Sequence, residues 1–152
     1  MLGTISLAGL VAGALDLAYV LVFFGMKGVG PTRVLHGIAA GLIGRTHATG
    51  GGLATATLGL AIHFAIAWCV AAVFFAASRR MRTLIERPIV SGLVYGVAVW
   101  LVMNLFVLPL TANPPASFPS PTWLPVLIAH LFCVGLPIAL VLRWAERARG
   151  LR

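Results

Sequence analysis

Residues 3–25, GTISLAGLVAGALDLAYVLVFFG, form an apolar run that a single charged side chain interrupts. At about 1.5 Å per residue, a helix over this run covers the roughly 30 Å of a bilayer's hydrocarbon core. The interrupting residue is Asp16, the only aspartate in the chain. The run therefore predicts a transmembrane helix, and Asp16 marks a position in it for which other parts of the protein must supply polar partners.

The whole chain has the composition of a membrane protein. Its 152 residues are 61% hydrophobic and only 9% charged, with a mean hydropathy of +1.04, whereas soluble domains contain about 25% charged residues. Apolar runs long enough to span a bilayer cover residues 3–25, 53–78, 89–110 and 123–143. We predict an all-α polytopic protein, with residues 1–152 forming a single four-helix transmembrane domain.

Basic residues predict the orientation of the chain, since Lys and Arg collect on the cytoplasmic side of a membrane. The side that follows the second and fourth runs carries Arg79, Arg80, Arg82, Arg87, Arg143, Arg147, Arg149 and Arg152, and the opposite side carries Lys27, Arg33 and Arg45. We therefore expect both termini in the cytoplasm and the protein in a bacterial inner membrane, in contact with lipids. The net charge of +8 does not indicate nucleic-acid binding, because these residues flank helices without a recognition motif.

The two outer connections differ in character. Residues 31–45 place Val34, Leu35, Ile38 and Leu42 at helical spacing behind Pro31, which predicts a short amphipathic helix lying in the outer membrane interface. A re-entrant segment that covers the bundle is the alternative interpretation. The second connection, TANPPASFPSPT at 111–122, is rich in proline, and we expect an extended, stiff cover.

Each predicted span carries one strongly polar side chain deep in its apolar run: Asp16, His63, Asn104 and His130. Counted along the helices, they lie at a similar depth, roughly 10–15 Å below the outer boundary. A lone aspartate at the centre of a membrane helix costs about 2.5–3.5 kcal/mol on insertion scales, so such groups usually face inward and pair. We therefore predict a buried polar cluster of these four residues.

Small residues predict where the helices approach each other closely. Gly9 and Gly13 in the first span and Gly92 and Gly96 in the third span each form a G-x-x-x-G pair, a pattern typical of helix packing in membranes. Pro137 in the fourth span removes a helical hydrogen bond from the carbonyl of Cys133, one turn from His130.

The second half of the chain resembles a known family. The histidine of the second span, the stretch GLVYGVAVWLVMNLFVLPLTANPP at 92–115 and AHLFCVGLPIAL at 129–140 resemble the YagU-like family of small bacterial inner-membrane proteins. The resemblance implies a helical inner-membrane fold and leaves the chemistry open. In that family the position of Asn104 can be a histidine.

Several functions fit the polar cluster. It can be a structural hydrogen-bond network, or a proton-linked transporter or proton relay for a small solute, because histidine and aspartate exchange protons readily. Haem b with His63 and His130 as axial ligands is a further alternative, and a metal held by these histidines and Asp16 is another. We expect none of these cofactors.

Enzymatic turnover is not indicated by the sequence. Cys69 and Cys133 lie singly in apolar spans without a C-x-x-C motif, and no nucleophile elbow is present. His36 and His47 lie in the outer connection, where we expect them in solvent. Since four spans enclose little volume, the favoured expectation is a non-enzymatic interaction or accessory subunit that forms a homo-oligomer or joins a larger membrane complex.

Overall fold

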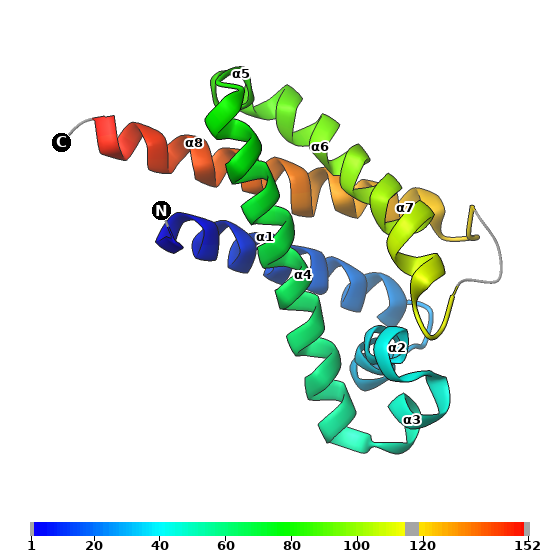
Figure 1. The fold of residues 1–152 in the computed structure, drawn as a ribbon. Coiled ribbons are helices and arrows are strands. Elements are labelled where there is room, and N and C mark those ends of the chain that lie inside the picture. Colours follow the sequence, from blue (N-terminus) through cyan, green and yellow to red (C-terminus); the bar gives the residue numbers. More distant parts are fainter. Residues whose placement is uncertain (1, 115–118, 151–152) are drawn as a thin grey trace.

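Four long helices run through the computed structural model, which describes residues 2–114 and 119–150 (Figure 1). The first is α1 (Leu2–Gly25) and the second is α4 (Gly52–Arg80). The third combines α6 (Pro88–Val102), the π-helical turn η1 (Met103–Val107) and the 3-10 turn η2 (Leu108–Leu110). The fourth combines α7 (Trp123–Ala129), the π-helical turn η3 (His130–Gly135) and α8 (Leu136–Gly150). Shorter helices connect them: α2 (Pro31–Ile43), α3 (Arg45–Gly50) and α5 (Thr83–Glu86).

The prediction of an all-α protein with four membrane-length helices is confirmed. The described residues contain no strand, and the four helices are long and apolar enough to cross a membrane by length and composition. Residues 115–118 of the proline-rich connection and Arg152 lie outside the described residues. The fourth helix runs past the expected end at 143, because the residues after it are mostly Ala, Glu and Arg, which favour helix.

Most of the apolar surface of these helices faces outward. In the most apolar 18-residue segment of each long helix, only 17–28% is buried inside the protein. Large apolar side chains such as Val22, Val94 and Leu110 are 63%, 63% and 87% exposed. An exposed apolar surface on every long helix is what a lipid environment stabilises and water does not.

The buried core is built largely from small side chains. Phe74 and Ile138 are the largest fully buried side chains. Around them pack Ala8, Ala12, Ala71, Phe75, Val99, Val134, Ala139 and Leu142. In lipid there is little hydrophobic gain from bringing two apolar helices together, so close van der Waals packing of small residues has to hold them.

Glycines form the closest contact between the third and fourth helices. Gly92 and Gly96 of α6 lie directly against Gly135 of η3, and Gly96 also lies against the backbone at His130. A Cβ atom added to Gly96 would stand 2.5 Å from the His130 carbonyl oxygen and 2.7 Å from the Leu131 Cα. The crossing therefore brings backbone against backbone.

The G-x-x-x-G pair of α1 faces α4. Gly9 lies against Trp68, and a Cβ at Gly13 would stand 2.9 Å from the Phe64 ring. Both sequence-predicted glycine pairs thus lie at contacts between long helices, one on each side of the bundle.

Two prolines account for the π-helical turns. In η1 the Leu108 amide bonds the Met103 carbonyl, and in η3 the Leu136 amide bonds the Leu131 carbonyl, five residues back in each case. A proline, Pro109 or Pro137, follows each of these amides. Because the proline ring would collide with the carbonyl of the preceding turn in an α-helix, the wider π turn before each proline relieves this collision.

Helix α2 packs against α4 near the end where α4 begins. The backbone of Leu35 lies against Gly59, and Nε2 of His36 donates a hydrogen bond to the Gly52 carbonyl at 2.8 Å. A small cluster of Ala39, Ala40 and Ala48 fills the space beside them. A helix thus occupies the region predicted to be amphipathic, and its placement at the membrane interface stays a prediction.

We call α1, α2, α3 and α4 the first half of the molecule and the segment from α6 to α8 the second half. Contacts at two places join α4 and α2 of the first half to the second half. In Figure 1, α6 runs alongside α7 and α8, whereas α4 crosses α1 at a steep angle. Tyr95 of α6 reaches α4, where its hydroxyl donates to the Val70 carbonyl at 2.7 Å and its ring contacts Phe74. At the other end, the amide of Ala112 donates to the Gly41 carbonyl of α2 at 2.8 Å.

The glycine crossing gives a direct test of the fold. Gly96→Ala places a methyl group into the backbone of η3, and we expect it to lower the free energy of unfolding by about 1–3 kcal/mol. Gly3→Ala is the matched control, because no atom lies within 4 Å of a Cβ at Gly3. Thermal unfolding in detergent, followed by tryptophan fluorescence, compares the two variants. Equal stability would contradict the contact.

Candidate functional site

A cavity of about 680 Å³ lies between the two halves of the bundle. Helices α1, α2 and α4 form one side, and α6, η1 and η3 form the other. Its wall is mostly apolar. The apolar lining includes Val20, Val34, Ile38, Ile62, Ile66, Val70, Val99, Met103, Val107 and Val134.

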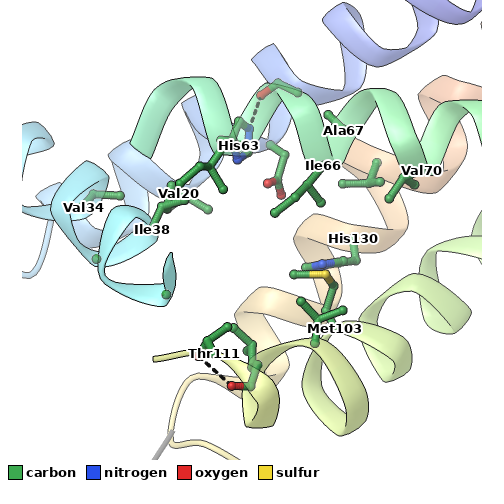
Figure 2. A pocket seen from close by; sticks show the side chains of 18 of the residues that line it. Val20, Val34, Ile38, His63, Ile66, Ala67, Val70, Met103, Thr111 and His130 are labelled. Carbon is green, nitrogen blue, oxygen red and sulfur yellow. Dashed lines mark hydrogen bonds between the residues drawn. The ribbon is translucent and has the colours of Figure 1, made fainter. Parts of the chain in front are cut away.

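Three of the four sequence-predicted polar residues line this cavity. Asp16 comes from α1, His63 from α4 and His130 from the first position of η3. Figure 2 shows His63 and His130 on different walls, with Ile66 between them in this view, Met103 on the side of His130 and Thr111 at the far end. Three separate membrane helices therefore deliver titratable side chains to one mostly apolar space.

Asn104 is not among the residues that line the cavity. Its side-chain amide donates to the Trp100 carbonyl at 2.9 Å, within the same helical segment. Val99, Met103 and Val107 do line the cavity and follow one another at steps of four, which places them on one helix face. Asn104 is one residue further round, about 100° away from that face.

Both histidines have a defined hydrogen bond to the backbone. Nε2 of His63 lies 2.9 Å from the Gly13 carbonyl of α1, and Nδ1 of His130 lies 2.8 Å from the Val126 carbonyl of its own helix. A carbonyl oxygen only accepts, so each of these nitrogens carries the proton. In the neutral rings, Nδ1 of His63 and Nε2 of His130 are therefore acceptors.

Asp16 lacks a partner for one of its oxygens. Its Oδ1 atom is buried and has no hydrogen bond within the described part of the chain. The groups that act on it electrostatically are His130 and His63. In the part of the chain that the structure describes, no ion pair joins Asp16 to either histidine. The carboxylate and the imidazoles therefore line the same cavity without direct contact. A buried acceptor without a donor costs about 1–3 kcal/mol.

Sequence reasoning missed the contribution of the outer connections to the cavity. Arg33 on α2 and Thr111 and Asn113 after η2 are part of the lining. Val34, Ile38 and Leu42, which the sequence places on one apolar helix face, line the cavity too. The amphipathic pattern was a usable signal for this face, but it does not say whether the face meets lipid or protein.

The remaining chemistry-bearing residues are not part of the cavity lining, although Cys133 interacts electrostatically with Asp16. Cys69 is exposed, Cys133 is half-buried and neither is in a disulfide. His36 bonds the Gly52 carbonyl, whereas His47 is exposed. Among the described residues, no group of three His, Cys, Asp or Glu side chains is arranged to hold a metal ion. Haem b between His63 and His130 stays an untested alternative, with Nδ1 of His63 and Nε2 of His130 as the nitrogens not bonded to the backbone.

Comparison with family models, curated proteins and solved structures found no match for this chain. The resemblance to the YagU-like family stays a prediction.

Replacing Asp16 distinguishes a structural network from a ligand site. Asp16→Asn keeps the shape of the side chain and removes the charge that burial penalises, so we expect the free energy of unfolding to rise by about 1 kcal/mol. Glu86→Gln, a change at an exposed carboxylate on α5, should leave stability nearly unchanged. A marked loss of stability in Asp16→Asn alone would show that Asp16 holds the helices together. Unfolding curves in the same detergent measure both variants.

Proposed function

We propose that this protein binds a small molecule with an apolar body in the cavity between its helices, and that binding is linked to proton exchange at Asp16, His63 and His130. The observation that carries this proposal is their position together on the wall of one cavity of about 680 Å³. Small-molecule sites typically measure about 300–1,000 Å³ and combine apolar walls with a few polar groups. The protein then acts as a proton-linked transporter or relay for a small solute.

The cavity also bears on the alternative of an accessory subunit. That expectation rested on the idea that four spans enclose little volume, and the volume present here is enough for a small molecule. A non-enzymatic interaction role, self-association and membership of a larger complex stay predictions. The structural-network interpretation is opposed by the Oδ1 atom of Asp16, because a network that only fixes helix register would satisfy it.

The setting we propose is the inner membrane of a bacterium, with both termini in the cytoplasm and α2 with residues 111–113 on the outer side. Positive charge supports this orientation. Arg79 and Arg80 end α4, Arg82 and Arg87 follow it, and Arg143 and Arg147 lie in the second half of α8. The cavity, lined at one end by α2 and Thr111, then lies in the outer half of the membrane.

The occupancy of the cavity can be tested by photolabelling. Aryl trifluoromethyl diazirines carrying an aminomethyl, a hydroxymethyl or a carboxylate group share one apolar body, and on illumination they insert into adjacent residues. We expect at least one of them to label cavity residues such as Ile66 and Met103 saturably, with competition by the corresponding benzyl compound that lacks the diazirine. Mass spectrometry of the digested protein locates the label.

A variant that fills the cavity provides the control for that experiment. Gly37 lines the cavity, and a Cβ added there meets no atom within 4 Å, so Gly37→Phe should fold and reduce saturable labelling by about tenfold or more. Gly3→Phe is the matched control, with equal free space outside the cavity. If no member of the series labels the wild-type cavity saturably, the proposed function is wrong.

Proton exchange needs a separate measurement. In liposomes that contain a pH-sensitive dye and carry an imposed pH gradient, we expect the protein to accelerate proton flux beyond that of protein-free vesicles. The double variant His63→Ala, His130→Ala should lose most of this acceleration, because both imidazoles on the cavity wall are gone. His47→Ala serves as the control, since His47 is exposed on α3 and lies outside the cavity lining. Wild-type flux equal to that of empty vesicles contradicts the relay.

A further inference from the structure

When Asp16 is ionised and both imidazoles are neutral, the side chains of Asp16, His63 and His130 accept hydrogen bonds from the cavity and donate none to it. His63 and His130 each direct one N–H at a backbone carbonyl, which leaves only the lone-pair nitrogen of each neutral ring. The ionised carboxylate of Asp16 accepts only, and its buried Oδ1 has no donor within the described residues. A ligand that complements this set has to bring the donors.

We infer that the cavity selects an organic amine in its ammonium form, with an apolar body. This inference rests on the proposed function and adds the chemical class of the molecule. A primary ammonium group carries up to three N–H donors and one positive charge, and the three acceptors come from three different helices, α1, α4 and η3. Hydrogen bonds between charged partners are roughly twice as strong as neutral ones.

The charges around the cavity favour a cation at this position. Among the described residues that line the cavity, Asp16 is the only acidic one, and both histidines act on it electrostatically. Arg33, the one lining residue with a permanent positive charge, is exposed on α2. An anion beside the ionised Asp16 and the two neutral imidazoles would face a carboxylate and two acceptor nitrogens.

The wall accommodates the rest of such a molecule. The lining includes Ile62, Ile66 and Val70 of α4 together with Val99, Met103 and Val107 of the third long helix. These branched and thioether side chains offer no hydrogen bonds to a ligand's body, so its apolar part stays in an apolar environment while its head group reaches Asp16. Met103 is unbranched and adapts to bodies of different shape.

This ligand class explains how binding is linked to protons. One carboxylate oxygen pair cannot hold a proton and form an ion pair with an ammonium group at the same time. When Asp16 carries a proton, that proton has to leave the cavity for water, directly or by way of a neutral imidazole, before the ammonium group pairs with the carboxylate. One positive charge enters the site and one leaves it, so the charge of the cavity stays constant through the exchange.

The three diazirine probes test the inference because they differ only in the head group. For the wild-type protein we expect the concentration of the aminomethyl probe that gives half-maximal labelling to be at least about tenfold lower than that of the hydroxymethyl probe. The carboxylate probe should label weakest. In Asp16→Asn the advantage of the amine over the alcohol should fall to about onefold, whereas Glu86→Gln should retain it.

The possible outcomes separate the two proposals. Saturable labelling in which the alcohol or the carboxylate equals or exceeds the amine overturns the amine inference and leaves the proposed function standing. Absence of saturable labelling by all three probes overturns the function itself. The wild-type comparison of head groups stands alone if Asp16→Asn does not fold. An amine advantage that survives in a folded Asp16→Asn variant would show that Asp16 is not the group that selects the charge.

Discussion

The need of the Asp16 carboxylate for partners inside a membrane helix is the constraint on which the structure depends. Lipid offers no hydrogen bonds, so a polar group on a spanning helix has to face the protein. Asp16 does so in a helix whose neighbouring positions Ala12 and Gly13 are buried and small. Gly13 also receives the N–H of His63 on its carbonyl. The same short segment therefore sets the approach of α1 to α4 and the position of the titratable groups.

The long helices and much of their packing can be predicted from the sequence, because both follow from local rules. An apolar run of membrane length has to be helical so that its backbone is satisfied internally. Small residues at a spacing of four mark the faces that meet, and Gly92 and Gly96 do lie against Gly135. Similar depth along the helices also identified Asp16, His63 and His130, because depth depends only on helix rise.

Rotation about the helix axis is what the sequence does not provide. Asn104 has a suitable depth but lies about 100° away from the face of Val99, Met103 and Val107, and it bonds its own backbone at Trp100. The turn η1 begins at Met103, so the helical phase changes at this position. The contact of α2 with Gly59 of α4 joins two separate helices, so the local sequence of α2 does not predict it either. The apolar pattern of α2 alone fits a membrane surface equally well.

The cavity persists because closing it would gain little in this environment. In water, apolar walls facing an open space would be driven together, but in lipid the contact of valine with valine is hardly better than that with an acyl chain. Tyr95 already joins α4 to α6. To close the cavity, the remaining lining segments of α4 and of the third helix would have to approach each other. The contact of α2 with Gly59 and the Ala112–Gly41 hydrogen bond would then have to break. Helix α2 thus acts as a spacer between the two halves, and the side chains of Asp16, His63 and His130 remain on the wall of an open cavity.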